Sequence, residues 1–286
     1  MKAWLCLAIG ALAHALTAPA RADGVAVHRL RESDRAAAEA AFTAATTPSN
    51  AQVSTFHIAP SLALALRLGA RWTSTLDATL GFTSFEQEAR ERRTSTRFGN
   101  PLLGFHLTLL AEPFRELRVG LAAAPPLVTT PGGLDANSAA AFADRVALQA
   151  RGTQAPWLWS NNAIPLLALV SLREHLFSNV ALRLDVQPGY LLSVNRRASR
   201  VALDVTARGE LRAGRWVPEA AFHLYTQSVP ILDGDYAQLS AAAALRYELA
   251  VAWLRAEFAL NLDGPAGFGM HNRTPWGVTL ASGARF

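Results

Sequence analysis

Charged side chains recur at alternate residues along this chain and stand opposite apolar positions. A period of two places such residues on one face of a β-strand. Their signs nearly balance, which argues against strong selectivity for anions or cations. The members of this polar face are Asp77, Arg118, Arg183, Asp185, Asp204, Arg208, Glu210, Glu219, His223, Arg246, Glu248, Arg255 and Glu257.

Carboxylates and guanidinium groups gathered in this way suit two roles. They can form ion pairs that fill a narrow interior and satisfy its buried charges. They can also line a polar path through which small solutes pass. In the second case the constriction would be set by these groups and by the long connection 125–162 folding inward.

Residue combinations that could catalyse a reaction or hold a cofactor are sparse. His175-Leu-Phe-Ser178-Asn179 contains the residue types of a Ser–His hydrolase, but it lies on an expected short turn and has the wrong spacing. No His, Cys, Asp and Glu cluster has metal-ligand spacing. Gly132-Gly133 lacks the strand–helix context of a phosphate loop. We therefore expect neither an enzyme nor a bound cofactor.

The elements that carry the polar face are predicted β-strands. Many reach about ten residues, the length that a tilted strand needs to cross a bilayer and more than the usual ~5–6. A secreted β-sandwich shares the alternation but not these lengths. The predicted strands cover about 53–66, 72–83, 95–110, 117–124, 164–172, 180–190, 201–211, 216–227, 238–248, 254–261 and 276–286.

The connections between these strands alternate in length. The short ones are 67–71, 111–116, 173–176, 213–215 and 249–250, and the longer ones are 86–94, 125–162, 193–199, 228–235 and 263–275. Short periplasmic turns and longer external loops are typical of outer-membrane barrels. Aromatic residues that could form the two interfacial girdles stand near strand ends: Trp72, Phe82, Trp157, Trp159, Phe177, Tyr190, Trp216 and Trp276.

The first residues predict export. Lys2 precedes an apolar stretch, and Ala20-Arg21-Ala22 fits the small-x-small cleavage pattern, so residues 1–22 are interpreted as a cleaved signal peptide. Cleavage removes the single cysteine, Cys6, and takes the formal charge from +5 to +3, because Lys2 and Arg21 leave. The remaining arginines are scattered, so we expect no nucleic-acid partner.

The strand count depends on residues 23–51, which form an N-terminal segment ahead of the barrel at 52–286. Eleven strands are readable from Val53 onward, whereas single-chain bacterial barrels have an even number. We therefore assign a weak strand within Ala36–Thr46, against its Ala-rich helix propensity. The alternative is a ten-stranded barrel whose N-terminal segment plugs the lumen. Residues 134–151 are predicted to be helical within the long external loop.

The mature chain resembles small bacterial outer-membrane β-barrels of the porin and transporter kind. Its last stretch alternates from Trp276 and ends on Phe286, like the terminal strand that the barrel-assembly machinery recognises in that family. Arg97-Phe-Gly-Asn-Pro-Leu-Leu-Gly104 resembles a strand opening of transporter barrels named for phenol degradation. The resemblance implies an all-β, single antiparallel barrel of about 12 strands in the outer membrane.

Two functions remain open at this point. The first is a passive channel for small solutes, with outer-membrane lipid around it. The second is a plugged structural or surface-interaction barrel without transport.

Overall fold

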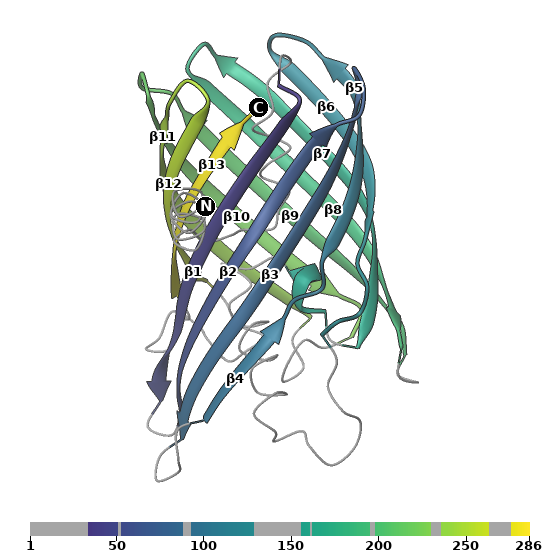
Figure 1. Cartoon of the computed structure of the whole chain (residues 1–286), viewed down its shortest axis with the longest axis vertical. Coiled ribbons are helices and arrows are strands. Elements are labelled where there is room, and N and C mark those ends of the chain that lie inside the picture. Colours follow the sequence, from purple (N-terminus) through teal and green to yellow (C-terminus); the bar gives the residue numbers. More distant parts are fainter. Residues whose placement is uncertain are drawn as a thin grey trace, which may run out of the picture.

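The computed structural model describes residues 34–50, 53–87, 93–128, 156–160, 162–194, 198–229, 236–262 and 276–286. Its strands wind with a common tilt around one closed antiparallel barrel (Figure 1). They are β1 (Ala36–Asn50), β2 (Val53–Arg67), β3 (Trp72–Gln87), β4 (Arg93–Phe98), β5 (Leu102–Ala111), β6 (Arg115–Ala123), β7 (Ala163–Phe177), β8 (Val180–Ser193), β9 (Arg200–Leu211), β10 (Trp216–Gln227), β11 (Ala237–Glu248), β12 (Ala252–Asn261) and β13 (Trp276–Arg285).

Twelve strands form the barrel wall, each paired with its neighbours in sequence, and β4 is an extra strand that pairs only with β3. The ring closes where β1 pairs with β13, from Ala37 opposite Arg285 to Thr46 opposite Trp276. Backbone bonds extend the closure past the strand ends: Arg35 N donates to Phe286 O at 2.7 Å, and Phe286 N to Ala36 O at 2.9 Å.

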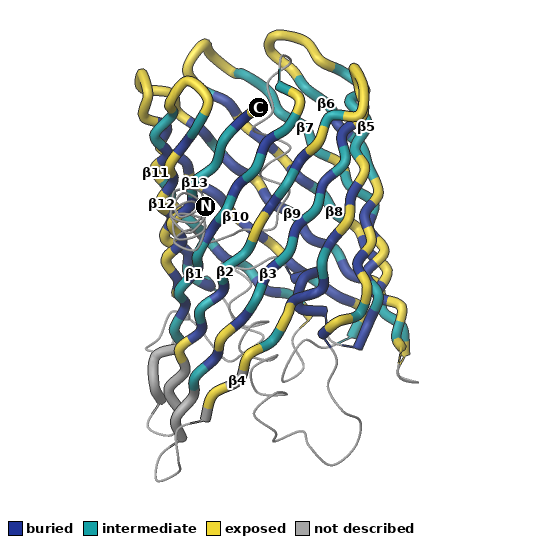
Figure 2. The backbone as a smooth tube through the Cα atoms, in the orientation of Figure 1, coloured by how far each residue is buried: buried dark blue, intermediate teal, exposed yellow. Residues whose placement is uncertain are grey.

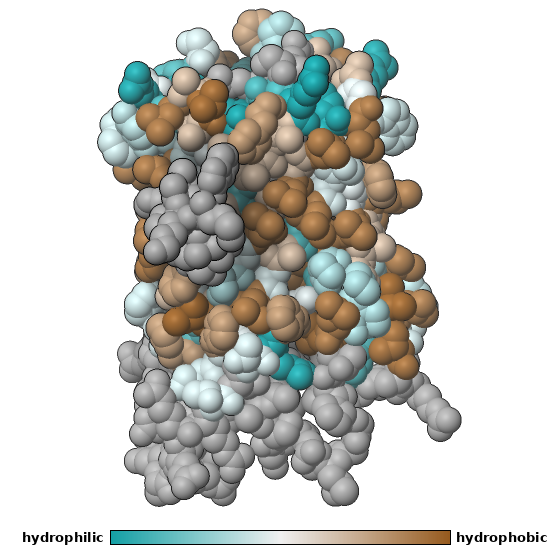
Figure 3. Space-filling model, viewed as in Figure 1, coloured by the Kyte–Doolittle hydropathy of each residue, from teal (hydrophilic) through white to brown (hydrophobic). Residues whose placement is uncertain are grey.

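Side chains alternate between the two faces of this wall, and buried and exposed residues alternate along most strands (Figure 2). The outer face is apolar, with Phe105, Leu121, Phe222 and Leu254 all more than half exposed, and Figure 3 shows the apolar residues as a broad band below a hydrophilic rim. This is the surface that a hydrocarbon layer covers. No helix in the described residues is long and apolar enough to span a membrane.

The predicted first strand is confirmed. Ala36–Asn50 forms β1 and pairs with both β2 and β13, so the ten-strand alternative is wrong. Ala37, Ala41 and Ala45 are buried on its inner face. Pairing on both sides overrides the helix propensity of alanine, because β13 would otherwise present open backbone groups to lipid. Residues 1–33, including the predicted signal peptide, lie outside the described residues.

Two predicted boundaries are wrong. The predicted strand 95–110 is broken into β4 and β5, because Pro101 has no N–H and the amide of Asn100 donates to Leu158 O at 2.7 Å instead of to a strand. The predicted turn 173–176 lies inside β7, and the chain turns at Ser178 and Asn179. The polar residues of this stretch continue β7, and Glu174 accepts from Arg115 of β6 at 2.6 Å.

The seam of the barrel carries one buried side-chain clamp. Trp253 of β12 is 1% exposed, and its Nε1 donates to Glu39 Oε2 of β1 at 2.6 Å. The indole therefore reaches across β13, where Gly283 leaves room for it. A Cβ at residue 283 would overlap the Trp253 ring and lie 2.7 Å from Ala38 O. Arg285 stacks over the same ring at 5.5 Å.

We predict that Gly283→Val destabilises the closed barrel. Overpacking costs about 1–3 kcal/mol, and here one colliding atom belongs to the backbone, which cannot rotate away. Urea unfolding of the refolded protein in lipid vesicles measures the change. Gly209→Val is the matched control, since a Cβ there meets only Leu182, at an ordinary 3.7 Å. Equal stability of the two variants would contradict the clamp.

Candidate functional site

The residues predicted for the polar face lie in the barrel interior. Each of the eleven proposed as pore-lining is at most 8% exposed: Asp77, Arg118, Arg183, Asp185, Asp204, Arg208, Glu219, His223, Arg246, Arg255 and Glu257. They stand on β3, β6 and β8 to β12. The alternation therefore orients them as predicted, and their role in a solute path stays a prediction.

Glu219 of β10 is the centre of an ion-pair belt across four neighbouring strands. Its Oε2 accepts from Arg208 Nη1 at 2.9 Å and from Arg255 Nε at 3.2 Å. Arg246 pairs with its other oxygen. Arg246 also reaches Glu210 at 3.3 Å and Glu248 at 3.1 Å. Three guanidinium groups thus share the carboxylate of Glu219, so the belt is a network rather than a set of separate pairs.

The register makes this network necessary. Directly opposed positions in the belt carry like charges: Glu219 faces Glu210, Arg246 faces Arg255, and Arg183 faces Arg208. Like charges directly opposite each other destabilise a sheet. The opposite charges meet on diagonals and along single strands instead, as in Arg183 to Asp185 at 2.6 Å. The pairs between neighbouring strands therefore join residues two positions away from direct opposition, as in Arg208 and Glu219.

A second polar group lies closer to the long connections. His223 Nε2 contacts Asp204 Oδ1 at 2.6 Å, and its Nδ1 is 3.4 Å from Ser240 Oγ. All three residues are buried. A histidine between a carboxylate and a hydroxyl resembles part of a hydrolytic triad. Here Ser240 is 1% exposed. The arrangement fits a buried polar bridge between β9, β10 and β11.

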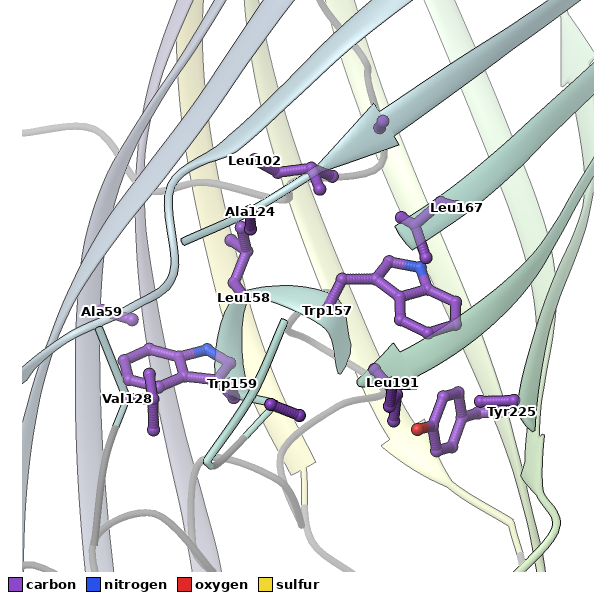
Figure 4. Close-up of a cluster of buried hydrophobic side chains, with 13 residues drawn as sticks. Ala59, Leu102, Ala124, Val128, Trp157, Leu158, Trp159, Leu167, Leu191 and Tyr225 are labelled. Carbon is purple, nitrogen blue, oxygen red and sulfur yellow. The ribbon is translucent and has the colours of Figure 1, made fainter. Parts of the chain in front are cut away.

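An apolar plug crosses the lumen nearer the long-loop end. It is the 3-10 helix η2 (Pro156–Trp159), all four of whose residues are buried. Trp157 and Trp159 point to different parts of the wall (Figure 4). Trp157 meets Tyr225 edge-on at 5.8 Å and donates Nε1 to Gln187 Oε1 at 2.8 Å. The remaining wall residues of the cluster include Ala59, Leu102, Ala122, Leu167, Leu191 and Ala202.

Glycines in the wall receive the two indole rings. A Cβ at Gly81 of β3 would lie 2.5 Å from Trp159, and one at Gly189 of β8 would lie 2.8 Å from Trp157. Any larger residue at either position would push the plug away from the wall. The fit of η2 therefore depends on two small residues more than a hundred positions apart in the chain.

Asn100 fastens the plug to the break between β4 and β5. Its Nδ2 donates to Ser160 O at 2.9 Å and to Trp157 O at 3.4 Å, and its Oδ1 accepts from Val128 N at 2.8 Å. The side chain is fully buried. One amide thus binds the chain on both sides of the segment 129–155, in addition to the bond from Trp157 to Gln187.

The structure corrects the predicted girdle and tests the predicted inward folding of the long connection. Trp157 and Trp159 do not belong to an interfacial girdle, because they are at most 1% exposed within the lumen. The other six proposed girdle aromatics are exposed: Trp72, Phe82, Phe177, Tyr190, Trp216 and Trp276. The inward folding of the connection 125–162 is confirmed for Pro156–Ser160, whereas its predicted helix 134–151 lies outside the described residues. Residues without an assigned role in the sequence analysis include Glu39, Asn100, Trp253 and Arg285.

Metal chemistry finds no support in the described residues, where no group of three or more His, Cys, Asp and Glu could hold a metal ion. His175, part of the string noted above, lies within β7 rather than on a turn.

Comparison with known proteins supports the architecture. The sequence matches no protein-family model and no curated protein. The fold resembles the COG4313 outer membrane channel from Pseudomonas putida F1, with a TM-score of 0.58 and 12% identity over 88% of this chain and 96% of that one. The chain has the fold of an outer-membrane β-barrel.

Two further solved structures show weaker similarity to this chain. The transport unit of the autotransporter AIDA-I from Escherichia coli gives a TM-score of 0.50 at 9% identity, covering 90% of this chain and 92% of that one. The toluene transporter TodX from Pseudomonas putida gives 0.48 at 10% identity, covering 96% and 93%.

We predict that Glu219→Gln strongly destabilises the outer-membrane barrel. Removing one partner of a buried ion pair costs about 3–5 kcal/mol, and three arginines lose their shared carboxylate here. Urea unfolding in lipid vesicles measures the loss. Glu174→Gln is the control, because its pair with Arg115 is exposed and such pairs contribute only about 0–1 kcal/mol. If both variants unfold alike, the belt is not a stabilising network.

Proposed function

We propose that the barrel is a passive channel for small solutes, with η2 as the gate. The supporting observation is that the obstruction and the wall are separate parts. The wall is a closed ring of paired strands, whereas the plug is four residues long and lies on a long connection. Displacing the plug breaks no pairing between strands of the barrel.

The interior chemistry supports passage of polar solutes. Outside the apolar cluster around the plug, the inner face carries threonines, histidine and charged groups, such as Thr43, Thr79, His223 and Asp204. These groups can exchange hydrogen bonds with water and with a solute. Twelve strands leave a lumen between the filled eight-stranded barrels and the open sixteen-stranded porins. The Pseudomonas putida barrel of similar fold is described as an outer membrane channel, which agrees with this proposal.

A plugged structural barrel is the second candidate. It is favoured by the complete burial of Trp157 and Trp159 and by the shared carboxylates of the belt. In that case the plug would be a permanent filling that stabilises the wall, and solutes would not cross.

We predict that Asn100→Ala increases the time that single channels spend open. The substitution removes three side-chain hydrogen bonds of η2 and its flanks, each contributing about 1 kcal/mol, so the displaced state gains at least about tenfold in population. Recordings in planar lipid bilayers measure it. Asn179→Ala on an exposed turn is the matched control and is expected to conduct like the parent protein.

Trp157→Ala tests the same gate by another route, because it removes an indole ring of the plug and keeps the backbone carbonyl that Asn100 binds. Its openings are expected to be longer and larger. Should the parent protein and both plug variants show no conductance steps, the channel proposal fails and the structural barrel stands.

A further inference from the structure

The end of the barrel opposite the plug holds a cavity of about 650 Å³. It lies among the short turns and the strand ends next to them. Because short turns of outer-membrane barrels face the periplasm, we assign this cavity to the periplasmic mouth. The ion-pair belt lies on the side of this cavity that faces the plug, so a solute that has crossed the lumen reaches this cavity last.

The cavity is lined by a strong excess of positive charge. Eight arginines stand against three glutamates, which leaves five formal positive charges. The whole chain carries a formal charge of only +5 over 286 residues. Positive and negative side chains are nearly balanced along the sequence, but they are not evenly distributed in space. The strand geometry concentrates arginine at one mouth.

Two carboxylates at this end of the barrel are shared between arginines. Glu248 accepts from Arg212 at 3.2 Å and from Arg246 at 3.1 Å. Glu210, next to the cavity, accepts from Arg173 at 3.1 Å and from Arg246 at 3.3 Å. Glu248 and Glu210 each serve two guanidinium groups, and the lining holds three glutamates against eight arginines, so its formal charge stays positive.

A row of arginines continues the positive surface along the wall. Arg173 of β7, Arg183 of β8 and Arg208 of β9 occupy directly opposed positions on three adjacent strands. Arg118 of β6 lies close enough to Arg183 and to Arg67 of β2 for their charges to interact. Guanidinium groups thus face the interior from several sides of the same end of the barrel.

Arg183 lies near Arg118 rather than in the cavity lining itself, and it adds a second observation. Its Nε donates to Asp185 Oδ2 at 2.6 Å, while its Nη1 and Nη2 are buried and make no hydrogen bond to any described residue. A buried guanidinium fork without acceptors is costly unless a ligand or water fills the position. Planar guanidinium forks match the oxygens of carboxylates and phosphates in a bidentate way.

We propose that the periplasmic mouth is a binding site for small multivalent oxyanions of the phosphate or polycarboxylate type. As the ligand class of the solute path, it rests on the proposed channel function and gives that channel a preference for anions. The binding itself can be measured on the folded barrel whether or not solutes cross it. Electrostatic attraction at this mouth also concentrates such anions locally.

Calorimetric titration of the full barrel in a neutral detergent with inorganic pyrophosphate tests the site. At low ionic strength we expect saturable binding that weakens with added salt. In the double variant Arg67→Gln, Arg118→Gln the dissociation constant is expected to rise by about tenfold or more, the factor for losing a charge-assisted contact. Arg215→Gln is the matched control, since Arg215 is an exposed arginine at the same end of the barrel but outside the cavity lining.

A milder variant covers the case in which the double variant does not fold. Arg71 lies on an exposed turn and lines the cavity, so Arg71→Gln is expected to fold and to weaken binding in the same direction. Absence of saturable binding by the parent protein would overturn the proposal. So would an equal loss of affinity in Arg215→Gln.

Bilayer recordings separate this inference from the channel proposal. Under a potassium chloride gradient, the reversal potential of a conducting parent protein should show preference for chloride, and Arg67→Gln, Arg118→Gln should reduce it. Conductance without anion preference or pyrophosphate binding rejects the oxyanion site alone. Pyrophosphate binding without any conductance rejects the channel alone. If nanodiscs containing phosphatidylglycerol abolish pyrophosphate binding, a lipid headgroup rather than a soluble solute occupies the mouth.

Discussion

The requirement that every backbone amide finds a partner within the sheet governs this structure. Hydrocarbon offers no hydrogen bonds, so an open sheet edge in the membrane is not tolerated. β1 meets this requirement by pairing with β2 and β13, although its residues are mostly alanine, threonine and serine. Once the ring is closed, the inner face is fixed in position, and the charged groups on it must be neutralised there.

Along the barrel axis, the interior falls into three zones of different side-chain chemistry. At the long-loop end, an apolar cluster of aromatic rings and small wall residues surrounds η2. In the middle, Glu219 and its arginine partners form a belt with shared carboxylates. At the opposite mouth, arginine is in excess. A solute would therefore meet apolar, balanced and then positive surroundings along one axis, which is a more specific sequence of environments than a uniformly polar pore provides.

Much of the wall could be predicted from the sequence because strand orientation is a local property. Alternation of apolar and polar residues identifies which way Asp204 or Arg255 points without knowledge of any neighbour. The register is not local, so the like-charged pairs Glu210 with Glu219 and Arg246 with Arg255 could not be foreseen. The same holds for η2, because Trp157 and Trp159 pack on Gly189 and Gly81 through tertiary contacts. Only Asn100-Pro101 gave a local sign of a broken strand.

The clamp between Trp253 and Glu39 bears on how the barrel assembles. Its two residues are 214 positions apart and belong to strands that flank β13 rather than to adjacent strands. Before β1 pairs with β13, Trp253 and Glu39 are not held close enough together to form this bond. It therefore adds stability only to the finished ring and none to its precursors, which sharpens the cooperativity of the last step. Contacts of such long sequence separation also form late, since the loop entropy must be lost first.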